Sequence, residues 1–262
     1  MRLYLEFVRR VFRRNAAYKV QYFTGLFNAL LGLFIGVAIW RAAYGGSDII
    51  DGIGKQEMVT YAVLGVLMRT LLTMNEYLID SKIRSGEIAV DLLKPYHFLG
   101  YVLSVIIGDM IFNLWTKVLP VLIVSILVFH LTLPADPTAA LLFLISLVLG
   151  FLVLYGFNLI FWLSAFWFHQ TWSILTIKNA VILLVSGATI PLWFMPQSLA
   201  DILAALPFKD IYFTPLAIYL GQVSGNEIVK ALVVQAGWII ILHGLAALLW
   251  NRAQSKLVIQ GG

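Results

Sequence analysis

The feature that most limits what this chain can fold into is a series of long apolar runs separated by polar connections. Six such runs span roughly residues 20–44, 58–79, 99–131, 138–168, 172–190 and 228–250. A membrane-crossing helix needs about 20 residues, which most of these runs supply. Hydrophobic residues make up 61% of the 262-residue chain and charged residues only 12%, whereas soluble domains carry about 25%. We therefore predict an all-α membrane protein with six transmembrane helices in a single transmembrane domain, residues 1–262.

Lysine and arginine are distributed unevenly between the two ends of these predicted helices. Twelve lie on the side of the N-terminus: Arg2, Arg9, Arg10, Arg13, Arg14, Lys19, Lys82, Arg84, Lys94, Lys178, Arg252 and Lys256. Four lie on the opposite side: Arg41, Lys55, Lys209 and Lys230. Basic residues concentrate in cytoplasmic connections, so both termini and the connection 80–96 are expected in the cytoplasm. The net charge of +5 follows from this bias and does not indicate a nucleic-acid partner.

The first 19 residues have the pattern of an amphipathic helix. Apolar side chains recur at helical spacing, and the arginines Arg9, Arg10, Arg13 and Arg14 occupy the other face. Such a helix lies along anionic lipid headgroups, which predicts an interfacial helix over residues 1–19 and the lipid bilayer as its partner. The alternative is a topology signal with no further role.

Residues 187–225 are apolar but contain four prolines, at positions 191, 196, 207 and 215. Proline removes a backbone donor and ends or kinks a helix, so one straight crossing is excluded. We expect one or two short re-entrant helices between the fifth and sixth spans, on the outer side. Irregular backbone at membrane depth has to be covered by protein or line a cavity.

Four charged residues fall inside or beside the predicted spans: Arg69, Glu76, Asp109 and Lys117. An unpaired charge at the bilayer centre costs about 3 kcal/mol on insertion scales, and one way to avoid this cost is a cluster with cross-helix pairs, Arg69 with Asp109 first among them. The alternative is that the helices extend into the cytoplasm and the side chains reach water.

Sequence motifs for catalysis and cofactor binding are absent. There is no P-loop, no zinc-binding His-Glu-x-x-His helix and no nucleophile elbow. No catalytic, cofactor-binding or metal-binding residue is therefore predicted, and the chain is not expected to be an enzyme.

The cytoplasmic connection contains the sequence SKIRSGEIAVDLLKP, residues 81–95. Gly86 can break the chain, and residues 87–93 can form two helical turns with Ile88 and Leu92 on one face. Asp91 and Lys94 are expected to point outward, and Pro95 to end the element. A short amphipathic helix at the cytoplasmic surface suits docking on a soluble partner; the alternative is a solvated hairpin tip.

The combination of this connection with the proline-rich region resembles a known family. Arg84, Gly86 and Glu87 are followed by Leu92, Leu93, Lys94 and Pro95, and the later region SGATIPLWFMPQSL…LPF…TPLAIYLG matches at Gly187, Pro191, Pro196, Pro207, Phe208, Pro215 and Gly221. In these places the chain resembles the permease subunit of type-2 ABC transporters, the six-span exporter class.

The resemblance also implies the partner subunits of a complete transporter. Such permeases carry no ATP site and pair with two copies of a separate ATPase subunit, which bind ATP and magnesium. Residues 80–96 are then the coupling helix, with ATPase coupling assigned to Arg84, Gly86, Glu87, Asp91, Leu92, Leu93, Lys94 and Pro95. A second permease subunit, identical or related, and a bacterial cytoplasmic (inner) membrane are also implied.

Two other functions fit the same spans. An ion-coupled secondary transporter would use the four intramembrane charges as a relay, although the halves of the chain show no inverted repeat. A non-transporting membrane scaffold is the second alternative. The sequence does not identify a substrate.

Overall fold

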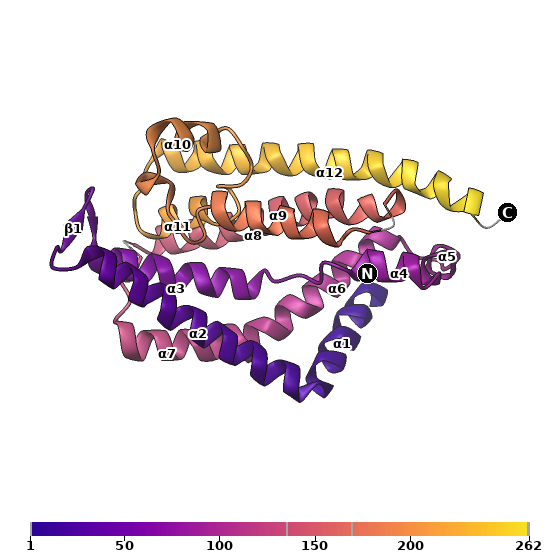
Figure 1. Ribbon diagram of the computed structural model, residues 1–262, viewed down its shortest axis with the longest axis horizontal. Helices are drawn as coiled ribbons and strands as arrows, with labels where there is room; N and C mark the ends of the chain where they lie inside the picture. Colours follow the sequence, from indigo (N-terminus) through magenta and orange to yellow (C-terminus); the bar gives the residue numbers. More distant parts are fainter. Residues whose placement is uncertain (1, 135, 169, 261–262) are drawn as a thin grey trace.

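The fold is an elongated helical bundle, described by a computed structural model over residues 2–134, 136–168 and 170–260 (Figure 1). Its elements are α1 (Arg2–Ala17), α2 (Lys19–Tyr44), β1 (Ile49–Ile50), β2 (Ile53–Gly54), α3 (Lys55–Leu71), α4 (Leu78–Arg84), α5 (Glu87–Leu92), α6 (Phe98–Asn113), the π-helix η1 (Leu114–Val118), α7 (Leu119–Phe129), α8 (Pro137–Leu163), the 3₁₀-helix η2 (Ser164–Phe166), α9 (Trp172–Val185), the 3₁₀-helix η3 (Leu192–Phe194), α10 (Gln197–Ala204), α11 (Phe213–Tyr219) and α12 (Asn226–Gln260). The strands β1 and β2 pair as an antiparallel hairpin at one end.

Four helical segments are long and apolar enough to cross a membrane. They are Lys19–Tyr44, Phe98–Phe129, Pro137–Phe166 and Asn226–Lys256. The other two expected spans contain shorter helices, because α3 has 17 residues and α9 has 14. The all-helical membrane fold is thus confirmed, with four spans identified by length and composition.

Local chemistry explains why α3 and α9 end earlier than expected. The second apolar run was expected to continue to residue 79, but α3 ends at Leu71. Shortly after it the side chain of Asn75 accepts a hydrogen bond from the Tyr77 amide at 3.1 Å, which offers the backbone an alternative to helix. Beyond α9, Gly187 has φ +76°, a left-handed conformation that follows many helix ends.

Helix α3 forms much of the interior. All residues from Met58 to Met68 are buried. Gly65 lets the backbone after α9 come close, since a Cβ there would lie 2.8 Å from the carbonyl oxygen of Ala188. One turn away the Tyr61 hydroxyl donates to the Gly187 carbonyl at 2.5 Å. The start of the 187–225 region is therefore inserted beside α3.

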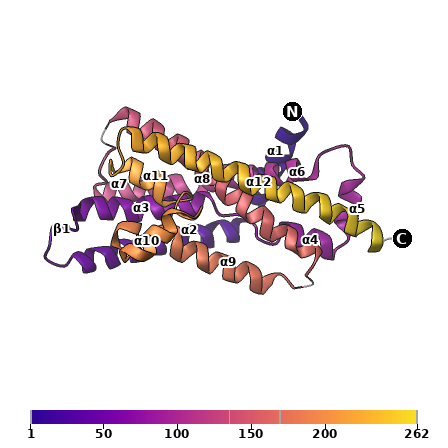
Figure 2. The same ribbon diagram turned by 90° about the horizontal axis from the view of Figure 1, so that it is seen from above.

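The region 187–225 consists of η3, α10, α11 and turns and contains no single long helix, while its re-entrant placement on the outer side stays a prediction. It lies toward the end of the bundle that carries the β1–β2 hairpin, whereas α4, α5 and the C-terminus lie at the other end (Figure 1). Gln235 of α12 is fully buried and donates to the backbone oxygens of Asp210 and Ser146. This side chain joins the region to α8 and α12, which Figure 2 shows lying side by side from a second direction.

Helix α1 runs across the bundle direction and packs on α6 (Figure 1). A Cβ at Gly100 would lie 2.9 Å from the Tyr4 ring, and one at Gly108 would lie 2.8 Å from Val11. Two glycines thus allow close contact, and α6 covers much of the apolar face that sequence assigned to lipid. Arg9, Arg10, Arg13 and Arg14 remain exposed, so the interfacial role of residues 1–19 stays a prediction.

Candidate functional site

The tip formed by α4 and α5 presents a small apolar surface. Gly86, at φ +75°, separates the two helices, as the sequence predicted. Ile88 is buried, while Val90 is 57% exposed and Leu93 is 87% exposed. The apolar face available to a partner is therefore formed by Val90 and Leu93, not by Ile88, and Leu92 is only partly exposed.

Asp91 holds this tip together. It was expected to point outward, and that is wrong: the residue is 4% exposed. Lys82 Nζ lies 2.6 Å and Lys94 Nζ 2.7 Å from its carboxylate oxygens, and the Tyr96 hydroxyl donates to it at 3.1 Å. Sequence reasoning missed Lys82, which lies on the preceding helix. A carboxylate with two ammonium partners stays inside because each of its charges is matched.

The pKa of Asp91 reflects the same balance. Burial alone would raise this pKa, but the hydrogen bonds from Lys82 and Lys94 outweigh burial, and the pKa lies below its ordinary value. The carboxylate is therefore ionised at neutral pH and fixes α5 against α4. Of the remaining predicted coupling residues, Arg84 pairs with Asp80 at 2.7 Å, while Glu87 and Pro95 are exposed.

A groove of about 690 Å³ separates α5 from α1. Its walls include Leu3, Phe7 and Arg10 from α1 and Glu87, Val90 and Lys94 from the α5 region. The Phe7 ring contacts the rings of Tyr96 and Tyr101, with centroids 5.3 and 5.1 Å apart. The N-terminal helix and the predicted coupling helix therefore line the same groove.

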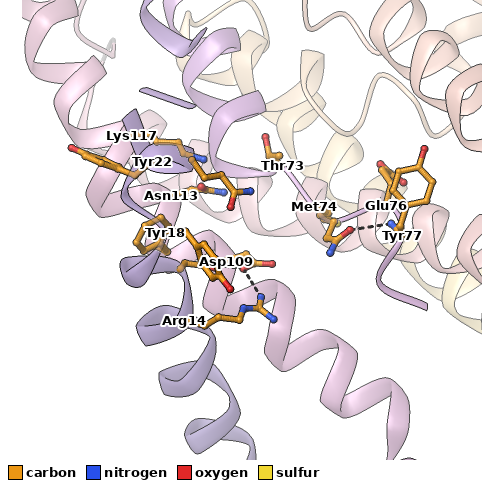
Figure 3. Close-up of a pocket in the computed structure, with 14 residues that line it drawn as sticks. Arg14, Tyr18, Tyr22, Thr73, Met74, Glu76, Tyr77, Asp109, Asn113 and Lys117 are labelled. Atoms are coloured by element: carbon orange, nitrogen blue, oxygen red, sulfur yellow. Dashed lines mark hydrogen bonds and ion pairs between the residues drawn. The ribbon is translucent and has the colours of Figure 1, made fainter. Parts of the chain in front are cut away.

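A second cavity, of about 670 Å³, lies where α1 meets α2. Figure 3 shows Arg14, Tyr18, Tyr22, Asp109, Asn113 and Lys117 on one side and Thr73, Met74, Glu76 and Tyr77 on the other. The lining comes from α1, α2, the connection after α3, α6 and η1. Three of the four intramembrane charges predicted to cluster therefore face one cavity.

The predicted pair of Arg69 with Asp109 is not formed. Asp109 accepts a hydrogen bond from Asn15 at 2.7 Å and lies 3.8 Å from Arg14. Arg69 instead approaches the Thr189 hydroxyl, 3.4 Å away. The backbone segment inserted beside α3 supplies this neighbour of Arg69.

Glu76 also has a different partner from the one expected. Lys178 Nζ lies 2.6 Å from Glu76 Oε2 and donates to Asn158 Oδ1 at 2.6 Å, while the Trp162 indole donates to Glu76 at 2.8 Å. The Lys178 side chain is 0% exposed. Sequence assigned Lys178 to the cytoplasmic charges, yet it lies within α9; its place inside an apolar run was the signal that could have identified it.

The sequence was compared with models of known protein families. A model of the family described as "ABC-2 family transporter protein" matches residues 28–261. A search of curated proteins found no similar sequence.

Proposed function

Because the chain belongs to the ABC-2 transporter family, a family of membrane transport permeases, we propose that it is the permease subunit of an ATP-driven exporter. Two copies of a separate ATPase bind ATP and Mg²⁺, and two permease copies, identical or related, enclose the transport path. The chain crosses a bacterial cytoplasmic membrane six times, α3 and α9 supplying the two shorter crossings. Both of its termini lie in the cytoplasm, and residues 187–225 cap the exit.

The observation that carries this proposal is the tip of α5, which is held against α4 by the ion pair between Asp91 and Lys82. Val90 and Leu93 are exposed at the end of a helix whose other side is held by buried Ile88 and Asp91. An exposed apolar pair on a rigid element suits a protein contact, because few side chains have to be ordered on binding. The groove beside α1 supplies a wall for the same partner.

The mechanism we propose is a two-state switch. ATP binding brings the two ATPases together, and α5 transmits this motion to the spans through α4 and the connection that contains Glu76. The equilibrium between inward-open and outward-open states then shifts by the difference in ATP affinity between them.

An ion-coupled secondary transporter would need the four intramembrane charges to lie together as a relay, and the contacts of these residues do not favour this alternative. Arg69 contacts Thr189 rather than Asp109, and Glu76 is engaged by Lys178. These charges therefore form separate local contacts and not one chain of proton acceptors.

Co-purification with the ATPase tests the proposal. Leu93→Glu places a charge in the proposed contact and is expected to reduce ATPase recovery about tenfold, the loss typical of a disrupted central contact. The matched control is Leu133→Glu, because Leu133 is 84% exposed and lies in the connection between α7 and α8 at the opposite end. Equal recovery with both variants would contradict docking through α5.

A further inference from the structure

Lys117 is a cation that forms no ion pair with a described residue, and Asp109 acts on it only from beyond salt-bridge distance. Among the described residues no carboxylate oxygen lies within 4.0 Å of its ammonium nitrogen. The two acids of the same cavity are already engaged, Asp109 by Asn15 and Arg14, and Glu76 by Lys178. A lone charge within a membrane span costs about 2.5–3.5 kcal/mol. Such charges in spans commonly mark a ligand path, and this one faces a cavity.

The backbone holds Lys117 in this position. Its helix changes from α to π over Leu114–Val118, a distortion that often occurs at functional sites. The end of the side chain lies over Gly25 of α2, where a Cβ would be 2.8 Å from Lys117 Cε and 3.1 Å from Nζ. Only a residue without a side chain leaves this space open, so α2 and η1 together place the ammonium group at the cavity.

Neutral polar groups surround the same space. Gln21, Tyr22 and Asn113 line the cavity, and within the described part of the chain their side chains make no hydrogen bond to protein. Amide and phenol groups can donate to an anion that the ammonium group attracts. The cavity therefore offers one cation that is not held in an ion pair and several unused donors.

An apolar surface begins beside these donors. Phe23 follows Tyr22 on α2 with ring centroids 4.7 Å apart, and Phe23, Phe27 and Leu31 are exposed along the helix. A molecule with a charged head in the cavity can lay an apolar tail on this face. A small soluble anion would leave that surface unused.

We propose that the cavity binds the anionic headgroup of an amphiphile, with Lys117 as its principal contact. The amphiphile enters from the inner leaflet and lies with its tail along α2. This assignment of a substrate class rests on the proposed permease function, but the binding itself involves only this chain.

A protection assay on the full chain tests the proposal. The protein has no cysteine, so Thr73→Cys provides a single thiol on the exposed wall opposite Lys117 (Figure 3). The rate of maleimide labelling is measured in neutral detergent with short-chain phosphatidylglycerol, phosphatidylcholine of equal chain length, or inorganic phosphate. At ten times its dissociation constant a ligand slows labelling about tenfold, and we expect this result for phosphatidylglycerol alone.

Three variants then assign the contact. Lys117→Met is expected to remove the protection and Lys117→Arg to keep it. Lys19→Met, which removes a nearby exposed charge outside the cavity lining, is expected to keep it as well. If Lys117→Met does not fold, Gly25→Ala displaces the ammonium group while keeping its charge, and protection is expected to weaken at least twofold.

Equal protection by phosphatidylcholine, or full protection in a folded Lys117→Met or Gly25→Ala variant, would overturn the site. Protection by inorganic phosphate at the same concentration would support an anion site and overturn the amphiphile. No ATPase is present in this assay, so its failure would leave the proposed permease function standing, and that function is tested separately by co-purification.

Discussion

Two lysines within the helical bundle, the buried Lys178 and the partly buried Lys117, differ in their surroundings. Lys178 is enclosed, with Glu76 and Asn158 as partners at 2.6 Å. Lys117 faces an open cavity and has no carboxylate within 4.0 Å among the described residues. A buried charge whose partners are all supplied by protein stabilises one arrangement of helices. A charge whose partners are missing is free to bind a ligand, so the same residue type serves structure in one region and binding in the other.

The largest expected effect is at the enclosed lysine. Lys178→Met leaves Glu76 without its cation and is expected to cost about 3–5 kcal/mol of stability. The loss is measured as a lower midpoint of thermal unfolding for the purified full chain. The double variant Lys178→Met with Glu76→Gln should recover part of the loss, because no lone charge remains.

Lys117→Met is the matched comparison, since it removes a charge without leaving a partner. Its unfolding midpoint should equal that of the wild type or exceed it. If Lys117→Met is as destabilising as Lys178→Met, the distinction between the two regions is wrong.

A smaller effect is expected at the tip formed by α4 and α5. Asp91→Asn removes the charge that Lys82 and Lys94 share and should weaken the local structure by about 2 kcal/mol, the range for hydrogen bonds to charged groups. Hydrogen exchange of the α5 amides measures this change. Glu87→Gln is the control, because Glu87 is exposed and lies 3.5 Å from Lys82, a geometry that contributes little.

The pH dependence of this tip follows from the lowered pKa of Asp91. A lowered pKa in the folded state adds stability that is present above the ordinary pKa and is lost as pH falls through the folded value. Protection of the α5 amides should therefore remain constant from neutral pH down to about pH 5 and decline below about pH 4. A decline that begins above pH 6 would show that another group controls the tip.

The smallest effect is expected for Arg69 and Asp109. They share no partner, since Arg69 approaches Thr189 and Asp109 binds Asn15. Arg69→Leu and Asp109→Leu should therefore be additive within about 0.5 kcal/mol. A double variant clearly more stable than the sum of the singles would indicate a direct pair in the membrane.

Features set by neighbouring residues were predictable from the sequence. The break at Gly86 and the short helices after Gly187 follow from glycine and proline chemistry, and the resemblance to ABC-2 permeases is confirmed by the family match. Contacts between distant residues were not predictable. Glu76 and Lys178 are 102 residues apart, and the segment that brings Thr189 to Arg69 enters the bundle where Gly65 leaves room for it.

The same limit applies to orientation within short helices. The residue spacing predicted that Asp91 lies on the outer face of α5. A helix of two turns can bury either side, and here the ion pair with Lys82 of the preceding helix keeps Asp91 inside. The early end of α3 depends on a side-chain hydrogen bond at Asn75, which a hydropathy pattern does not register.

Site-specific cross-linking tests most directly whether α5 is the contact through which this permease meets its ATPase. A photoreactive group attached to Leu93→Cys in the assembled complex should give an adduct with the ATPase, and the same group on Leu133→Cys at the opposite end should give none. The absence of native cysteines restricts attachment in this chain to the chosen position. Adducts of equal yield from both positions, or none from Leu93→Cys in a complex that hydrolyses ATP, would contradict the account.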